Sequence, residues 1–287
     1  MKQKIFLHIG FGKTGTSAIQ GMLVNNFFQL KNDGILYPKI GMLGAGHHLL
    51  AKLESTSFNE EIESLYKMLI EEIEKSYCEN TILSSEYFCF CQPSYIQAMA
   101  DTLRNFDVKI VFYIREQTKL IESAFLQWVK AGHNYQGNIK NFYQLHRNSF
   151  DFQARIQPWV EYFSESAIIA RLFDKKIVGK DVCSDFNQLL SLKPNIGNYE
   201  SPQVNPSLLA EFFNIVALLD KLNLDKDDRE SLMQELLQLS QTFKPCASLS
   251  LIDQQLEKDI KMHFKASNQA FSQHFLSHNE TQLLLNT

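Results

Sequence analysis

The segment from Gly10 to Ser17 carries the residue types that bind anions in proteins. It reads GFGKTGTS and follows a short apolar run, residues 5–9. Glycines let a backbone turn tightly and approach a ligand, and the N–H groups at the start of a following helix attract negative charge. Lysine adds a positive charge, and hydroxyl groups add hydrogen-bond donors. We therefore predict a site for phosphate or a similar oxyanion, formed by Gly10, Gly12, Lys13, Thr14, Gly15, Thr16 and Ser17.

The spacing within this segment differs from that of the loop that binds ATP or GTP. That loop requires a glycine five residues before its Gly-Lys pair. The pair here is Gly12-Lys13, and the position in question is Leu7, inside the apolar run. The nucleoside-triphosphate motif is therefore excluded, and the pattern favours a loop that wraps a smaller anion.

A second candidate anion site follows the most strand-like run in the chain, VKIVFYI at residues 108–114. Arg115 comes directly after this run, and Ser123 lies eight residues later in a predicted helix. A guanidinium group stays charged and can bind phosphate through two hydrogen bonds, to which a serine hydroxyl would add a third. The alternative is that Arg115 is a surface or salt-bridging residue and Ser123 an ordinary hydroxyl on a helix surface.

Together the two stretches resemble the sulfotransferases that use 3′-phosphoadenosine-5′-phosphosulfate (PAPS). The pattern G-x-x-K-[ST]-G-T-[ST], here Gly10 to Ser17, resembles their loop for the 5′-phosphosulfate. Arg115 and Ser123 resemble the pair that holds the 3′-phosphate in that family. The likeness covers about residues 4–275, with its specific motifs in the first 130, and bacterial carbohydrate sulfotransferases fit best.

The resemblance implies a reaction and its participants. A sulfuryl group would pass from PAPS to a hydroxyl or amine of a carbohydrate, a glycolipid or another small-molecule acceptor, with no metal required. Lys13 would neutralise the charge that builds on the leaving phosphate. The sequence offers Glu86, His48 and His47 as bases for the acceptor hydroxyl. Histidine titrates near neutrality and suits the work, whereas Glu86 ends a predicted strand at the sheet edge where α/β folds bind ligands.

These three candidates also have structural interpretations, which stay open. Glu86 could pair with Lys13 or cap a turn, and one of two adjacent histidines is usually structural or exposed. His8, inside the first apolar run, is predicted to be a hydrogen-bonded interior histidine.

Alternating strands and helices must position these residues. Apolar runs indicate strands at 5–9, 35–38, 81–88, 108–114 and 166–173, and amphipathic segments indicate helices at 18–33, 59–78, 95–104 and 118–131. This alternation predicts a parallel sheet with helices on both faces. We therefore expect an α/β, P-loop-like three-layer fold in a single domain over residues 1–287. Its α/β nucleotide-binding core would span 1–192, and a mainly helical part would span 193–287.

Composition limits the partners and the compartment. The net charge of −4 argues against a general basic surface for nucleic acid. No run reaches the ~18 apolar residues of a membrane span, and the N-terminus lacks the pattern of a signal peptide. Five cysteines without a CxxC pair fit a reducing compartment. We therefore expect a cytoplasmic protein with no nucleic-acid partner and no membrane span.

Two other functions are compatible with an anion loop. A P-loop kinase with a degenerate loop would need an aspartate for Mg²⁺ at a strand end, whereas the runs here end in Ser84-Ser85-Glu86 and in Arg115. A non-catalytic module would keep the nucleotide pocket without turnover. Replacing Lys13 separates these cases, because an enzyme would lose turnover far beyond any loss of affinity.

Overall fold

The chain forms two compact units. The computed structural model describes residues 2–51, 58–131, 138–179, 181–191, 209–213, 215–216, 222, 224–242 and 250–286. The first unit comprises Met1–Arg115, Phe152–Pro202 and Ala266–Thr287, and the second comprises Glu116–Asp151 and Gln203–Lys265. The single domain with a boundary at residue 192 stays a prediction, and residues 192–208, where its helical part begins, lie outside the described residues.

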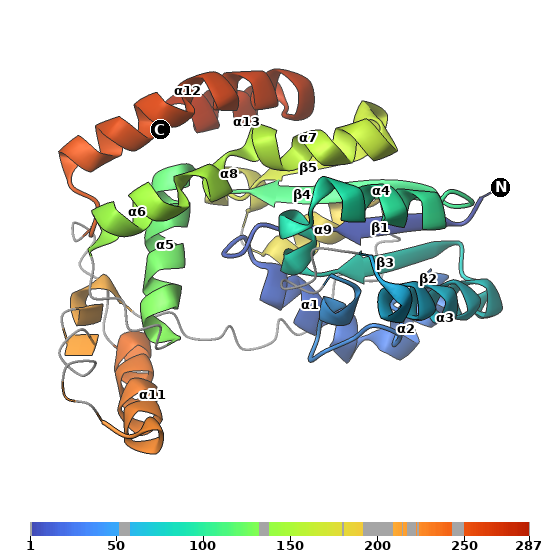
Figure 1. Ribbon diagram of the computed structural model, residues 1–287, viewed down its shortest axis with the longest axis horizontal. Coiled ribbons are helices and arrows are strands. Elements are labelled where there is room, and N and C mark those ends of the chain that lie inside the picture. Colours follow the sequence, from blue (N-terminus) through green and yellow to red (C-terminus); the bar gives the residue numbers. More distant parts are fainter. Residues whose placement is uncertain are drawn as a thin grey trace. The chain divides into compact units, whose positions relative to one another are not determined.

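The first unit is built on a parallel sheet of five strands in the order β2-β3-β1-β4-β5. Each neighbouring pair of strands is parallel. The strands are β1 (Lys4–His8), β2 (Ile35–Leu36), β3 (Asn80–Ser84), β4 (Asp107–Ile114) and β5 (Ile168–Leu172). Because β1 lies between β3 and β4, residues that follow these three strands meet at one edge of the sheet (Figure 1). Ligands of open α/β sheets bind at this edge.

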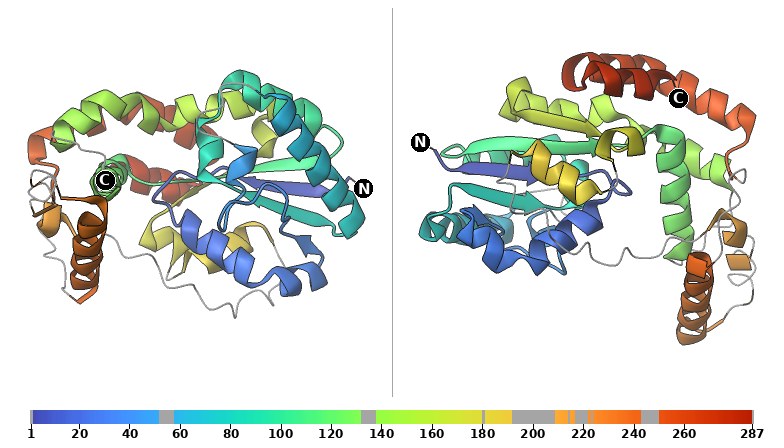
Figure 2. Two further views of the ribbon diagram at one scale, coloured as in Figure 1. Left: turned by 60° about the horizontal axis from the view of Figure 1, so that its bottom comes forward. Right: turned by 180° about the vertical axis from the view of Figure 1, so that it is seen from behind.

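Helices cover both faces of this sheet, which confirms the predicted three-layer α/β fold. One face packs against α1 (Thr16–Asn25), α2 (Phe27–Asn32) and α9 (Val182–Leu189) in one buried apolar cluster. The other face packs against α7 (Phe152–Phe163) and the end of α12 (Gln254–Phe275), where the ring of Phe271 lies 6.0 Å from that of Phe112. Figures 1 and 2 show α1 and α7 on opposite sides of the sheet.

The described part of the first unit contains further helices. They are α3 (Glu60–Ser76), α4 (Pro93–Thr102), α8 (Lys175–Val178) and α13 (His278–Asn286). Helix α3 buries the stripe Ile62, Tyr66, Leu69 and Ile73, and the side chain of Asn59 caps its first turn by accepting from the Ile62 N–H. This spacing of three and four residues is the helical period that the sequence displays.

Two predicted elements have different boundaries in the structure. The strand predicted for residues 81–88 is wrong beyond Ser84, because Glu86–Phe90 form a 3₁₀ helix, η2. The side chain of Ser85 starts this helix by accepting the Tyr87 N–H at 3.2 Å. The single helix predicted at 18–33 is two helices, α1 and α2, separated at Asn26, whose amide donates to the Met22 carbonyl at 2.7 Å.

The described residues of the second unit form helices. They are α5 (Gln117–Lys130), α6 (Ile139–His146), α11 (Lys226–Thr242) and the part of α12 up to Lys265, with short 3₁₀ turns at Arg147–Phe150 and Ala210–Phe212. In the chain as far as it is described, no helix is both long and apolar enough to cross a bilayer.

Candidate functional site

The loop between β1 and α1 holds three residues with left-handed backbone. They are Gly10 with φ 33°, Lys13 with φ 70° and Gly15 with φ 85°. The left-handed conformation costs a residue other than glycine roughly 1–2 kcal/mol, so Lys13 is held there by its surroundings. The loop therefore curls back on itself before the first turn of α1, as its glycines predict.

The start of α1 offers donors that the backbone does not use. Within the described part of the chain, the N–H groups of Thr14, Gly15, Thr16 and Ser17 donate to no backbone carbonyl. Gly15 is the N-cap residue, and the first turn of α1 contains no acidic side chain. These N–H groups and the positive end of the helix dipole are therefore suited to an anion, and the predicted anion site stays a prediction.

Packing explains why two of the three loop glycines are needed. A Cβ atom on Gly15 would lie 2.9 Å from Val182 Cγ1 and 3.2 Å from the ring of Phe173, and one on Gly10 would lie 2.9 Å from Thr16 Oγ1. A Cβ on Gly12 would meet no atom within 4 Å. The hydroxyl of Thr14 is buried and donates to the Phe11 carbonyl at 2.5 Å, so it holds the loop itself.

Alanine at Gly15 and alanine at Gly12 should differ in their effect on the stability of the protein. Gly15→Ala should destabilise the protein by about 2–4 kcal/mol, because it adds a left-handed alanine and a clash with α9. Gly12→Ala should change stability by less than about 0.5 kcal/mol, since its methyl group meets open space. Thermal and urea unfolding of both variants measure the difference, and equal stabilities for the two would contradict this account of the loop.

Arg115 lies beside the loop, at the end of β4. Its Nη1 donates to the carbonyl oxygen of Lys13 at 3.3 Å, and its guanidinium carbon lies 5.9 Å from the centre of the Phe173 ring. The structure therefore brings together the strand-end arginine and the loop lysine of the predicted site. Ser123 lies in α5 of the second unit and is partly buried. Its pairing with Arg115 on one ligand stays a prediction.

His47 is a structural residue in this arrangement. Its Nε2 donates to the Pro38 carbonyl at 2.9 Å, and its Nδ1 accepts the Ser84 N–H at 3.1 Å. The main-chain N–H of His47 donates to the Ser84 carbonyl at 2.7 Å. Because both ring nitrogens are engaged and the ring is buried, His47 has no nitrogen left for an acceptor. It fixes the glycine-containing segment of residues 40–48 to the end of β3.

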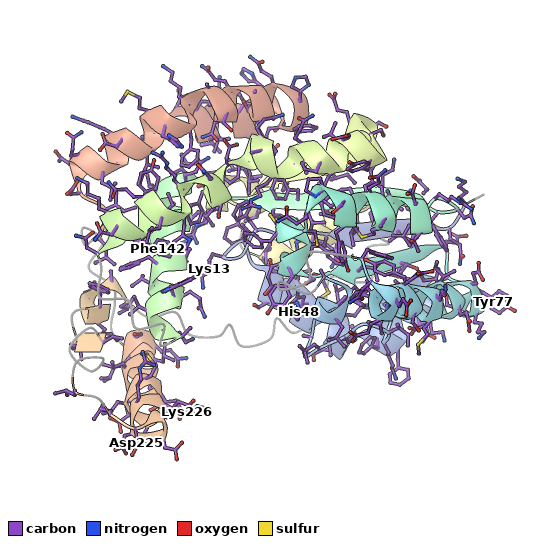
Figure 3. All side chains as sticks on the ribbon, viewed as in Figure 1. Lys13, His48, Tyr77, Phe142, Asp225 and Lys226 are labelled. Atoms are coloured by element: carbon purple, nitrogen blue, oxygen red, sulfur yellow. The ribbon has the colours of Figure 1, made fainter. Side chains whose placement is uncertain are left out.

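Glu86 and His48 lie together near the end of β1, where the loop of residues 10–17 begins. The Ser85 N–H donates to the His8 carbonyl at 3.1 Å, which extends the pairing of β1 and β3 by one residue. His48 Nδ1 lies 2.8 Å from Ser85 Oγ and 4.0 Å from Glu86 Oε2, and its ring contacts that of Tyr87 at 4.6 Å. Figure 3 shows Lys13 and His48 on the side of the sheet at which the strands end.

A chain of buried polar side chains leads from the interior of the sheet to Glu86. His8 Nδ1 lies 2.9 Å from Ser84 Oγ. The Nε2 of Gln20 lies 3.2 Å from the same Ser84 oxygen and 3.3 Å from Glu86 Oε2. His8 is thus a hydrogen-bonded interior histidine. Sequence reasoning missed Gln20 and Ser84, although a glutamine on the apolar stripe of α1 was a usable signal.

Burial of the two histidines makes stability depend on pH. Burial lowers the pKa of His47 to about 4 and that of His8 to about 3. The unfolded chain protonates both near pH 6.5, so it binds more protons than the folded chain below that pH. The free energy of unfolding should therefore decrease as pH falls from about 6.5 to about 4, by up to about 2–3 kcal/mol per pH unit.

Urea titrations between pH 7 and pH 4.5 measure this slope. His47→Gln should reduce this slope by about half, because only His8 of the two buried histidines would then take up a proton on unfolding. His278→Gln changes an exposed histidine of α13 and serves as the control. A stability that stays constant between pH 6.5 and 5 would rule out neutral, buried rings at these positions.

No protein-family model matches the chain. A protein of Archaeoglobus fulgidus described as uncharacterized is 30% identical over 162 residues, which are 55% of this chain and 43% of that protein. The match thus spans less than half of that relative's length. In the described residues, no group of three or more His, Cys, Asp or Glu side chains could hold a metal ion.

Two solved structures are similar to the chain at low identity. One is a sulfotransferase from Alicyclobacillus acidocaldarius, with a TM-score of 0.49 and 13% identity over 98% of this chain and 95% of that one. The other is retinol dehydratase in complex with androsterone and the inactive cofactor PAP, with a TM-score of 0.39 and 13% identity over 92% and 80% of the two chains.

Proposed function

We propose that this protein is a sulfotransferase that moves a sulfuryl group from PAPS to a hydroxyl of a carbohydrate or glycolipid acceptor. The observation that carries the proposal is the loop at residues 10–17. It has the family's spacing and a curled backbone, and its N–H groups at residues 14–17 donate to no carbonyl of the described backbone. The arginine at the end of β4 supports it, because its guanidinium reaches the carbonyl of the loop lysine.

The residues present fit an anionic nucleotide. Gly10 and Gly15 let the loop pack closely on its neighbours, where a Cβ atom would lie 2.9 Å from Thr16 and from Val182 respectively. In the proposal, the N–H groups of residues 14–17 hold the 5′-phosphate, Lys13 binds the sulfated end, and Arg115 with Ser123 holds the 3′-phosphate. PAPS supplies an activated sulfuryl group when it is bound.

The chain's part in the reaction is to position groups and stabilise charge. Transfer breaks the bond between sulfur and the bridging phosphate oxygen and forms one between sulfur and the acceptor oxygen. By analogy with phosphoryl transfer, we expect charge to collect on the leaving oxygen, where Lys13 would neutralise it. The acceptor proton would pass to Glu86, which lies at the start of the loop and is about a third exposed. His48 would support this carboxylate from 4.0 Å.

Calorimetry with two nucleotides tests the cofactor. Adenosine 3′,5′-bisphosphate (PAP) should bind with micromolar affinity, and ATP with Mg²⁺ should not bind. The reverse result would favour the kinase alternative, and binding of neither would overturn the proposal. Arg115→Met should weaken PAP binding strongly but adenosine 5′-phosphate little, because the arginine is assigned to the 3′-phosphate.

Labelled sulfate tests the acceptor. Incubation of the protein with ³⁵S-labelled PAPS and a panel of glycans, glycolipids and phenols should label a member of the first two groups. Labelling of phenols alone would overturn the carbohydrate assignment and leave the transfer reaction standing. Turnover of no acceptor together with tight PAP binding would favour the non-catalytic module.

A further inference from the structure

The amide of Gln20 bridges two oxygen atoms at the end of β3. One is Ser84 Oγ at 3.2 Å, and the other is Glu86 Oε2 at 3.3 Å. An ionised carboxylate only accepts hydrogen bonds, so the amide must present its NH₂ group to Glu86. Gln20 is 4% exposed, on the apolar stripe of α1, so the protein buries a polar side chain to make this bridge. A buried polar group is costly unless its partners are kept, so both contacts are expected to persist.

The partner on the interior side of this bridge is fixed as well. Ser84 Oγ accepts from Gln20 and also lies 2.9 Å from Nδ1 of His8. His8 is fully buried, and burial lowers its pKa to about 3, so its ring stays neutral. The bridge is therefore anchored to β1 and β3, two neighbouring interior strands, and does not depend on a flexible surface residue.

Gly46 leaves the room that this arrangement needs. A Cβ atom on Gly46 would lie 2.8 Å from Gln20 Nε2 and 2.7 Å from His48 Nε2. The same residue pairs with Leu43 through a hydrogen bond from the Leu43 N–H to the Gly46 carbonyl at 2.9 Å. The absence of a side chain at this one position thus admits both groups that lie against the Glu86 carboxylate.

From these contacts we infer that Gln20 is a positioning residue that orients the Glu86 carboxylate, through the contact to its Oε2, as the base of the proposed transfer. Oε2 is engaged by Gln20, whereas in the described chain Oε1 accepts no hydrogen bond and is left to take the acceptor proton. A hydrogen bond to the charged form of a carboxyl group favours that form. The role of Glu86 as the base rests on the proposed function. The contacts of Gln20 with Ser84 and Glu86 do not depend on it.

Carbon-13 NMR of the glutamate carboxyl groups tests the inference in the free protein, with the Glu86 signal assigned from Glu86→Gln. Gln20→Met keeps the length of the side chain and removes both donors to oxygen, so the titration midpoint of Glu86 should move up. Gln20→Glu adds a second carboxylate beside the first, so it should move the midpoint further. Among the described residues, the other ionisable groups found to interact with Glu86 are His48 and Tyr37, and both are unchanged in these variants.

Matched controls come from a second amide–carboxylate pair. Gln29 donates to Asp33 at 3.0 Å on the exposed surface of α2. Gln29→Met and Gln29→Glu make the same chemical changes and should leave the Glu86 midpoint where it is. Gly46→Ala removes no hydrogen-bonding group, but its methyl group would displace Gln20 and His48. It should therefore shift the Glu86 midpoint in the same direction as Gln20→Met. It replaces Gln20→Met in the test if that variant does not fold.

An unchanged Glu86 midpoint in both folded Gln20 variants would overturn the inference, and so would an equal shift in the Gln29 controls. PAP affinity measured by calorimetry should stay within about twofold in Gln20→Met, because this side chain is assigned to the base and not to the nucleotide. Failure of the wild-type protein to bind PAP would overturn the proposed function but would not change the Glu86 midpoints of the Gln20 variants. Failure of the proposed function and failure of this inference are therefore distinguishable.

Discussion

Replacing Lys13 with alanine should lower sulfuryl transfer about 1000-fold and weaken PAP binding only about tenfold. A cation beside the leaving phosphate stabilises charge that appears only in the transition state, and removal of such a group typically costs a factor of about 100 to 1000 in rate. PAP already carries the phosphate charge, so binding loses one charge-assisted contact, worth about 1.4 kcal/mol for each factor of ten. Single-turnover transfer from PAPS and calorimetry with PAP measure the two effects.

The backbone conformation at residue 13 allows the wild-type protein and Lys13→Ala to be compared without a change in the loop. Lysine and alanine pay a similar cost in the left-handed region that this position adopts, so the substitution should leave the loop conformation unchanged. Lys31→Ala removes an exposed lysine of α2 and controls for a general loss of positive charge. Equal losses of affinity and turnover would contradict a role for Lys13 in the transition state, because only ground-state binding would then have been removed.

The loop and the sheet could be predicted from sequence because their signals are local. Glycines at positions 10 and 15 mark two backbone conformations that other residues avoid, and the structure has both in the left-handed region. The apolar runs became five parallel strands because each run is short, buried and followed by a helical segment. The end of β3 was predicted less well, since a serine that caps a turn and a serine in a strand look the same in a sequence.

The contacts around Glu86 depend on residues that are far apart in the chain. His48 meets Ser85 across 37 positions, and Gln20 meets Glu86 across 66. No periodicity connects such residues, so the sequence left His47, His48 and Glu86 as alternative candidates for the base. The structure separates the two histidines because one has both ring nitrogens bound to main-chain groups and the other lies against Ser85 and Glu86.

The identity of the base gives the last prediction. Glu86→Gln should lower sulfuryl transfer about 1000-fold, within the range of about 100 to 10,000 that general acid–base groups contribute. PAP affinity should stay within about twofold, because the carboxylate is assigned to the acceptor. The amide is nearly isosteric and can still pair with Gln20 through its oxygen, so the fold should survive. Single-turnover transfer to the acceptor found with labelled PAPS measures the loss.

His48→Asn distinguishes the second candidate. An asparagine amide can keep the hydrogen bond to Ser85, so the loop should stay in place, and we expect transfer to fall less than about tenfold if the ring only supports Glu86 across 4.0 Å. Glu71→Gln, in an exposed pair with Lys75 on α3, is the matched control for loss of a carboxylate. A large loss in His48→Asn with near-normal transfer in Glu86→Gln would assign proton abstraction to the histidine. Glu86 would then be the residue that orients the ring, because Oε2 is the carboxylate atom nearest to Nδ1.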